Sequence, residues 1–388
     1  MMNITSVKRI HQSDWTDSGV RFLRARDIVA ASKNEEPDDY LYISEEKYEE
    51  YSALSGKVDI NDLLVTGVGT IGVPYLVENL EPLYFKDGNI IWFQNKNKID
   101  GKFLYYSFIG NGIQSFIKAS AGTGTVGTYT IDTGKKTPIQ IPSKEEQRKI
   151  GEYLTNIDHL ITLHQRKIDK LKNLKKAMLE KMFPKKGSVI PEIRFNGFAN
   201  AWEQRKLGEL AEIVGGGTPS TSVESYWDGD IDWYAPAEIG EQIYLKSSQR
   251  KITEEGLNKS SAKVLPVGTV LFTSRAGIGK TAILLKEGCT NQGFQSIVPN
   301  KNKLDSYFIF TRSEELKRYG ETVGAGSTFV EVSGKQMANM ELMMPTTMDE
   351  QQKIGEYFSN LDNLITLHQR KLDMLKKLKS ACLSEMFI

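Results

Sequence analysis

A long segment of this chain occurs twice. Residues 146–183 align without a gap with residues 350–387, a shift of 204 positions, and 26 of the 38 aligned residues are identical. Such repetition constrains the fold more than any local motif, because both copies of a repeat are expected to adopt the same local structure. The chain is therefore expected to consist of two related halves.

Each copy of the repeat has the pattern of a coiled-coil helix. Its apolar residues are spaced alternately by four and three positions, which places them along one seam of a helix. A helix of 38 residues would be about 57 Å long, and Pro184 ends the first copy. We expect the two helices to pair, and to meet partners, through Ile150, Leu154, Ile157, Ile161, His164, Ile168, Leu171, Ile354, Phe358, Leu361, Ile365, His368, Leu372 and Leu375.

The two seam histidines have two interpretations. His164 and His368 could hold a metal ion, but no other ligand type stands beside either of them at metal-binding spacing. A polar residue in a coiled-coil seam also fixes the register of the helices at some cost in stability. The sequence favours this second interpretation, and we predict no metal site.

The parts of the chain between the helices are also related, but more weakly. Residues 64–72 resemble residues 271–279, and residues 96–100 resemble residues 301–305, with shifts of 207 and 205 positions. Short β-branched and aromatic runs between Gly, Asn and Asp are typical of mixed α/β domains with many turns. Each half is thus expected to be a globular domain followed by a long helix. Since only the helices are nearly identical, we expect the helices to share one task and the domains to differ.

Composition leaves several partner classes open. The chain has 50 Lys and Arg against 49 Asp and Glu, a net charge of +1, so an acidic partner would have to be bound by local patches. Two cysteines cannot form a disulfide framework, and no apolar run approaches the roughly 18 residues of a membrane span. We expect a cytoplasmic protein without a membrane partner.

Motifs for bond chemistry are missing from the sequence. Residues 277–281 resemble the end of a phosphate-binding loop, but Ser274 stands where that loop requires glycine. The corresponding residues 69–73 contain no lysine, and the chain has neither a Pro-Pro pair, as in the motif of amino-methylating enzymes, nor a Gly-x-Ser-x-Gly motif. We predict a non-catalytic chain with no cofactor of its own.

Several motifs together resemble one family. Residues 191–198 (PEIRFNGF), 202–208 (WEQRKLG) and 216–220 (GGTPS) resemble the segment that leads into a recognition domain in specificity subunits of type I restriction-modification systems. The Leu-His-Gln-Arg-Lys runs at 163–167 and 367–371 resemble the two conserved helices of that family. The resemblance covers nearly the whole chain.

This resemblance implies an α+β fold with two α/β target recognition domains separated by two long antiparallel coiled-coil helices and related by a pseudo-two-fold repeat. Each domain would read one half of a bipartite, asymmetric double-stranded DNA target. The helices would set the spacer and dock two methyltransferase subunits, and restriction and translocase subunits would complete a defence against foreign DNA through DNA methylation and cleavage. S-adenosylmethionine, ATP and Mg²⁺ would be bound by those partners. The implied recognition domains are residues 1–143 and 201–346, the helices 144–183 and 347–388, and the linker 184–200.

The chain departs from this family pattern at its beginning. Residues 1–15 contain no counterpart of the segment that leads into the second domain, beyond a Thr5-Ser6 pair. We expect the first domain to lack about 25 residues that the second possesses.

Residue types select the candidate DNA contacts. Arg, Lys, Asn and Gln read base edges, Ser and Thr are adaptable partners, and basic side chains bind phosphates. The candidates are Arg21, Arg24, Arg26, Lys118, Thr123, Thr125 and Tyr129 in the first domain, and Tyr234, Ser248, Gln249, Arg250, Lys251, Arg275, Lys280 and Thr328 in the second.

Two other function classes remain as alternatives. A structural adaptor would use the coiled coil to join proteins and would not bind DNA specifically. An enzyme that uses residues 277–281 would bind nucleotides through Lys280.

Overall fold

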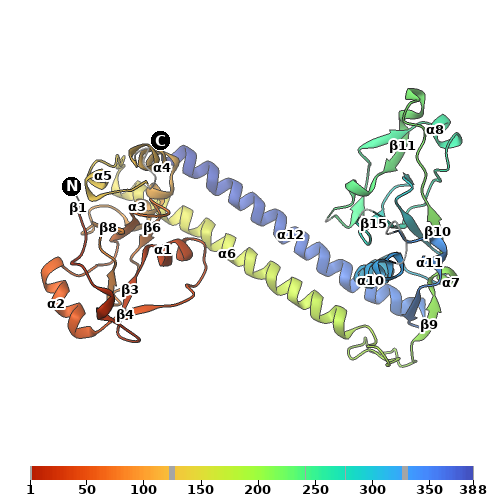
Figure 1. Cartoon of the computed structure of the whole chain (residues 1–388), viewed down its shortest axis with the longest axis horizontal. Helices are drawn as coiled ribbons and strands as arrows, with labels where there is room; N and C mark the ends of the chain where they lie inside the picture. The colour runs from red at the N-terminus through yellow and green to blue at the C-terminus, as the bar shows by residue number, and fades with distance from the viewer. Residues whose placement is uncertain (1, 122–126, 241, 276, 326–330, 388) are drawn as a thin grey trace. The chain divides into compact units, whose positions relative to one another are not determined.

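The computed structural model describes residues 2–121, 127–240, 242–275, 277–325 and 331–387. The chain forms two compact units: a first unit of Met1–Arg166 with His368–Ile388, and a second unit of Lys167–Leu367. Each long helix therefore contributes to both units: α6 (Lys144–Lys181) begins in the first unit, and α12 (Met348–Met386) ends in it. The last turns of α12 belong to the first unit and lie near α4 (Figure 1).

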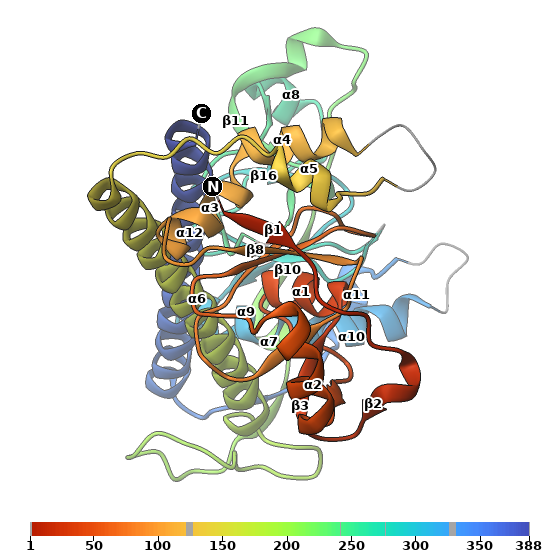
Figure 2. The same ribbon diagram turned by 90° about the vertical axis from the view of Figure 1, so that its left-hand side faces the viewer.

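The first unit contains two four-stranded sheets, in the orders β1-β8-β5-β6 and β2-β4-β3-β7. Figure 2 turns this unit toward the reader, with β1 beside β8 at the sheet edge. Large buried side chains such as Trp92, Phe93 and Phe85 fill its core. Its strands are β1 (Asn3–Thr5), β2 (Trp15–Thr16), β3 (Val20–Leu23), β4 (Leu41–Ile43), β5 (Leu63–Thr66), β6 (Pro74–Leu76), β7 (Leu83–Phe85) and β8 (Ile90–Gln94), and its shorter helices are α1 (Ala25–Ser32), α2 (Glu45–Ser55), α3 (Gly101–Ile109), α4 (Asn111–Ser120) and α5 (Ile131–Lys135).

The second unit contains sheets of five, three and two strands, in the orders β10-β17-β14-β15-β12, β13-β11-β16 and β18-β9. Phe272, Phe294 and Phe308 are fully buried in its core. Its strands are β9 (Glu203–Lys206), β10 (Ala211–Gly215), β11 (Trp227–Tyr234), β12 (Tyr244–Leu245), β13 (Arg250–Ile252), β14 (Val270–Phe272), β15 (Thr281–Leu284), β16 (Cys289–Thr290), β17 (Gln295–Pro299) and β18 (Glu341–Met344), and its shorter helices are α7 (Leu207–Leu210), α8 (Glu254–Asn258), α9 (Ser306–Thr311), α10 (Ser313–Gly324) and α11 (Gly334–Ala338).

The same polar contact joins a domain to a long helix in each unit. The Asp100 side chain caps α3 by accepting from the Phe103 amide at 2.9 Å, and the Asp100 amide donates to Gln147 of α6 at 2.9 Å. In the second unit Asp305 caps α9 by accepting from the Phe308 amide at 2.7 Å, and its amide donates to Gln351 at 3.1 Å. These contacts satisfy orphan amides at helix starts.

The long helices pack antiparallel in both units. In the first unit Asp158 pairs with Lys379, and His164 contacts His368. Residues that come later in α6 thus lie beside residues that come earlier in α12. Lys175 pairs with Asp362 in the second unit in the same sense. The predicted α+β class and the two long helices are confirmed. Within the described parts of the chain, no helix has both the length and the apolar character needed to cross a bilayer.

Candidate nucleic-acid interface

The arginines predicted for the first domain differ in how exposed they are and in the partners they bind. Arg24 is largely buried and binds Asp27 and Asp39 at 2.8 and 2.9 Å. The hydrogen bond from Arg24 lowers the pKa of the Asp39 carboxyl, which therefore stays charged near neutral pH. Arg26, 61% exposed, approaches the same Asp39 at 2.5 Å, and Arg21 lies over the Tyr40 ring at 4.7 Å. Arg24 is thus a positioning residue, while Arg21 and Arg26 can reach a ligand.

Among the described residues, no hydrogen bond or ion pair joins Lys118, another predicted contact, to these arginines. Lys118 is exposed in the last turn of α4. Thr123 and Thr125 lie outside the described residues, as does Thr328 of the second domain. Their roles remain predictions.

Two predicted contacts are corrected by their burial. Tyr129 is 1% exposed, and its hydroxyl lies in hydrogen-bond contact with Thr137. Tyr234 is fully buried in β11, with its ring in the core. Burial raises the pKa of Tyr129 to about 12. Both rings therefore fill cores and do not present a hydroxyl to DNA. Tyrosine is amphipathic and suits both cores and surfaces, so its residue type alone does not reveal whether it is buried.

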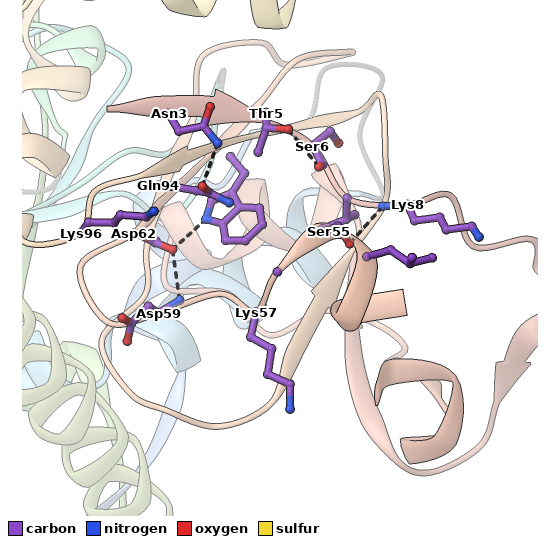
Figure 3. A pocket seen from close by; sticks show the side chains of 14 residues that line it. Asn3, Thr5, Ser6, Lys8, Ser55, Lys57, Asp59, Asp62, Gln94 and Lys96 are labelled. Carbon is purple, nitrogen blue, oxygen red and sulfur yellow. Dashed lines mark hydrogen bonds between the residues drawn. The ribbon is translucent and has the colours of Figure 1, made fainter. Parts of the chain in front are cut away.

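A polar pocket that the sequence did not reveal lies in the first unit (Figure 3). Lys8, Lys57 and Lys96 line it together with the hydrogen-bonded pair Asn3 and Gln94, whose atoms are 2.8 Å apart. All three lysines are exposed. They come from separate segments of the chain, so only folding gathers them. Lysines and amides suit phosphate contacts, but the carboxylates of Asp59 and Asp62 line the same pocket, and Lys57 already pairs with Glu49 at 2.7 Å.

A fixed loop carries the predicted contacts of the second domain between β12 and β13. Asp232 is 1% exposed and accepts hydrogen bonds from the amide and hydroxyl of Ser248, both at 3.0 Å. Burial opposes ionisation, but these bonds lower the pKa of Asp232. The charged carboxylate also lies 3.5 Å from the Lys251 ammonium. The buried acid therefore holds the loop in one conformation.

The side chains at the tip of this loop remain exposed. The Gln249 amide donates to Glu238 at 2.7 Å, which fixes the backbone and leaves the side chain in solvent. Arg250 stacks its guanidinium over Trp227 at 3.7 Å. An exposed glutamine and a pre-oriented arginine on a fixed backbone are suited to reading bases in a groove.

Residues 277–281 form a turn that connects two antiparallel strands. The turn joins β14 to β15, Gly277 and Gly279 have φ values of 105° and 96°, and the Thr273 hydroxyl accepts from the Lys280 amide at 2.9 Å. A phosphate-binding loop would instead lead into a helix. This geometry excludes the nucleotide-binding alternative. Lys280 is exposed on the turn and Arg275 is half-buried before it, so both can meet DNA.

The predicted seam residues are all buried or half-buried. In the first unit Leu154 and Ile157 form a cluster with Cys382 and Leu383. His164 and His368 meet with their Nδ1 atoms 2.9 Å apart. The two rings therefore contact each other directly at the interface between the helices. Among the described residues no group of three or more ligand-type side chains could hold a metal ion.

A repeated set of three residues links each domain to both helices. Asp158 of α6 accepts from Tyr106 of α3 and from Lys379 of α12, at 2.7 and 2.8 Å. In the second unit Asp362 accepts from Tyr307 at 2.8 Å and from Lys175 at 2.6 Å. Burial raises the pKa of both tyrosines further above their usual range, so each hydroxyl stays protonated and donates. The sequence repeat contained the Asp and Lys of this set but not its tyrosines.

An apolar face lies outside the seam on each long helix. Leu160 and Leu163 of α6 are 42% and 46% exposed. Their counterparts Leu364 and Leu367 of α12 are 44% and 49% exposed. Leucines at spacing i, i+3 lie on one helix face. The identity of these off-seam leucines in both copies was the sequence signal for this surface.

Comparison with known proteins places these features in context. A family model described as the type I restriction modification DNA specificity domain matches residues 20–173 and 199–377. The MjaIX specificity subunit of a type I restriction enzyme from Methanocaldococcus jannaschii is 35% identical over 48% of this chain, and the match spans 44% of that relative. The MjaX specificity subunit of the same organism, itself a putative assignment, is 26% identical over 87% of this chain and 80% of its own length. The S subunit of a type I system from M. genitalium has a similar fold, with a TM-score of 0.60 at 15% identity, covering 100% of this chain and 94% of the other.

Proposed function

Because the chain belongs to the type I restriction-modification DNA specificity family, we propose that it selects the DNA target of a methyltransferase and restriction complex. The family model matches once in each half of the chain. Each unit would read one half of a bipartite, asymmetric target in double-stranded DNA. The proposal rests on the observation that two unlike domains are joined to nearly identical helices. Unlike domains suit half-sites that differ in sequence.

The continuous helices would act as the spacer between the half-sites. Helices α6 and α12 run for 38 and 39 residues. A rigid helical pair fixes how many unread base pairs lie between two DNA contacts, as half-site spacing follows protein geometry.

The exposed leucines would dock the methyltransferase subunits. Leu163 and Leu367 point away from the seam and are about half exposed, so their replacement would leave helix pairing intact. Exposed apolar surface of this kind is typical of protein interfaces. Equivalent leucines on the two helices fit two copies of one partner. The methyltransferase and motor partners would supply S-adenosylmethionine, ATP and Mg²⁺, and this chain would do no bond chemistry in the cytoplasm, where the complex meets DNA.

Co-expression of the chain with its methyltransferase tests the proposal. Sequencing of modified bases in host DNA should reveal one two-part motif that is modified on both strands, with N6-methyladenine as the expected base. The structural adaptor remains the alternative, and it predicts no such motif. Binding of the assembled complex to its target should also weaken steeply with salt, because phosphate contacts release counterions.

Docking has its own test. Leu163→Asp and Leu367→Asp should each weaken methyltransferase binding by about tenfold or more, as charged substitutions in apolar interfaces do. The melting temperature of the isolated chain should change little. Glu152→Asp, at an exposed position on α6, is the matched control. Unchanged co-purification of the methyltransferase with both leucine variants would contradict the docking role.

A further inference from the structure

The turn between β16 and β17 of the second unit holds one exposed amide in a fixed place. The amide of Asn291 donates to the Tyr234 carbonyl at 3.0 Å, and the Asn291 side chain accepts from the amide of Gly293 at 2.6 Å. The Gly293 carbonyl accepts from the Ser274 amide at 2.8 Å. Gln292, between these two anchored residues, is exposed. The backbone is therefore fixed on both sides of a polar side chain that lies in solvent.

The loop of residues 216–220, the Gly-Gly-Thr-Pro-Ser motif, fixes the side chain of Gln292 as well. Its Thr218 hydroxyl donates to the side-chain oxygen of Gln292. A Cβ atom at Gly216 would lie 1.9 Å from the Asn291 carbonyl oxygen, so the loop can approach the turn this closely only with glycine there. The hydrogen bond engages the oxygen of the amide and leaves its NH2 group, with two donors, for a ligand.

Arg275, a candidate DNA contact, lies beside the same turn. A Cβ atom at Gly293 would be 3.6 Å from the Arg275 Nε atom. The guanidinium and the NH2 group of Gln292 both donate hydrogen bonds. In the major groove such donors match the N7 and O6 atoms of guanine and the O4 atom of thymine.

The turn is also connected to the exposed tip of the loop between β12 and β13. A Cβ atom at Gly293 would be 2.9 Å from the Cγ atom of Pro236, which begins the short helix η3 (Pro236–Glu238). Glu238, at the end of η3, accepts from the Gln249 amide at 2.7 Å. The exposed amide of the turn therefore belongs to the surface that carries the other candidate contacts of this domain.

The first unit has an equivalent turn between β7 and β8. Strand β7 pairs parallel with β3 as β16 pairs parallel with β11. The Lys86 amide donates to the Leu23 carbonyl at 2.9 Å, and the Asn89 carbonyl accepts from the Gly67 amide at 2.7 Å. These are the same two backbone contacts that anchor the turn of the second unit, so the two turns occupy the same place in the two domains.

The residue types in this place favour bases over phosphates. Asp87 follows Lys86 in the first turn as Gln292 follows Asn291 in the second. A carboxylate is repelled by phosphate, but it accepts hydrogen bonds from the amino group of cytosine. An amide NH2 group donates to acceptor atoms of other bases. A contact with base edges suits both residues, whereas a contact with phosphate suits only the glutamine.

We propose that Gln292 reads a base edge in the half-site bound by the second unit, with Thr218 as its positioning residue. Asp87 takes the equivalent place in the first unit. This inference rests on the proposed function and adds to it a residue that determines specificity. Because its oxygen is bound to Thr218, Gln292 donates from its NH2 group to an acceptor such as guanine O6 or N7 or thymine O4.

Gln292→Ala, in the complex with methyltransferase subunits, tests the base contact. Sequencing of modified bases first defines the motif of the unaltered chain, and competition binding then uses DNA altered at one base pair at a time. Discrimination should fall about tenfold at one position of one half-site and stay unchanged in the other half. Gln352→Ala, exposed on α12, is the matched control and should change neither half.

The possible failures can be told apart. Equal loss of affinity for every DNA would assign Gln292 to a phosphate, and full discrimination at every position would leave it without a base contact. Either result overturns this inference alone. Absence of any two-part motif for the unaltered chain would overturn the proposed function and this inference with it.

Gln292→Glu replaces the donating NH2 group with an accepting oxygen. The preferred base at the affected position should change to one that offers an amino group, such as cytosine. Modified-base sequencing with this variant would show the altered motif. A variant that keeps the original base preference would contradict donation by Gln292.

Thr218→Val tests the positioning role, because it removes the hydroxyl and keeps the shape of the side chain. Discrimination should fall at the same base pair that Gln292→Ala affects, and Thr218→Ser should restore it. The melting temperature of the chain should change little in both variants. Loss of thermal stability without any loss of discrimination in Thr218→Val would show a merely structural role.

Asp87→Ala extends the test to the first unit. Discrimination should fall at one position of the half-site that Gln292→Ala leaves unchanged. The same competition binding measures it. An effect of both variants on the same half-site would overturn the equivalence of the two turns.

Discussion

The two units attach their domains to the helices through the same residue types, but these residues are more deeply buried in the second unit than in the first. The side chain of Asp362 is 9% exposed, whereas that of its counterpart Asp158 is 34% exposed. Glu350 is buried beneath Arg194, whereas Glu146 lies in solvent. Identical residues at equivalent positions of a repeat thus have different energetic roles. Coulomb interactions strengthen as water is excluded, so the second unit should depend more strongly on these groups.

The largest difference is expected at the paired glutamates. Glu350→Ala leaves Arg194 buried without its partner and should lower the free energy of unfolding of the second unit by about 3–5 kcal/mol. Glu146→Ala removes an exposed carboxylate and should cost less than about 0.5 kcal/mol. Urea denaturation, with hydrogen exchange to follow each unit, measures both. Similar losses for the two variants would show that Glu146 is paired in solution as strongly as Glu350.

A smaller difference is expected at the paired aspartates. Asp362→Ala strands the buried Tyr307 hydroxyl and the Lys175 ammonium and should cost about 2–3 kcal/mol. Asp158→Ala acts at a more exposed pair and should cost about 1 kcal/mol. Thermal unfolding of each variant gives the two values. Asp373→Ala, on the exposed side of α12, serves as the control. A larger loss of stability in Asp158→Ala than in Asp362→Ala would contradict the comparison.

The smallest effects concern DNA reading, where the units should act separately. Arg250→Ala should weaken recognition of one half-site by about 1–3 kcal/mol and leave the other half unchanged. Arg26→Ala should act on the other half, and more weakly if Arg26 contacts only phosphate. Competition binding with DNA altered in one half at a time separates these outcomes. Loss at the same half for both variants would contradict one reader per unit.

The sequence predicted the long helices well because their pattern is local. Alternating spacings of four and three define a helix face without any knowledge of distant residues, and the helices begin at Lys144 and Met348, close to the predicted positions. The same pattern did not show that Leu163, which lies outside the seam, is exposed. Its exposure depends on where the other helix lies, and only folding reveals that.

Candidate DNA contacts were less predictable because residue type does not report burial. Tyr129 and Tyr234 have a suitable chemistry but lie in cores. Lys8, Lys57 and Lys96 were missed because they are distant in sequence and share one pocket only in the fold. The fixed loop around Gln249 contained the right residue types, but the buried Asp232 that holds it gave no local signal.

The sequence by itself determined that the chain is a repeat of a variable domain and a conserved helix. Repetition and periodicity are properties of the order of residues, so no coordinates are needed to find them. Only the tertiary structure decided that Glu350 is buried under Arg194 and Trp202 while Glu146 is left open beside Phe103 and Phe387. Burial and pairing arise from contacts between residues far apart in the chain, which a linear pattern does not contain.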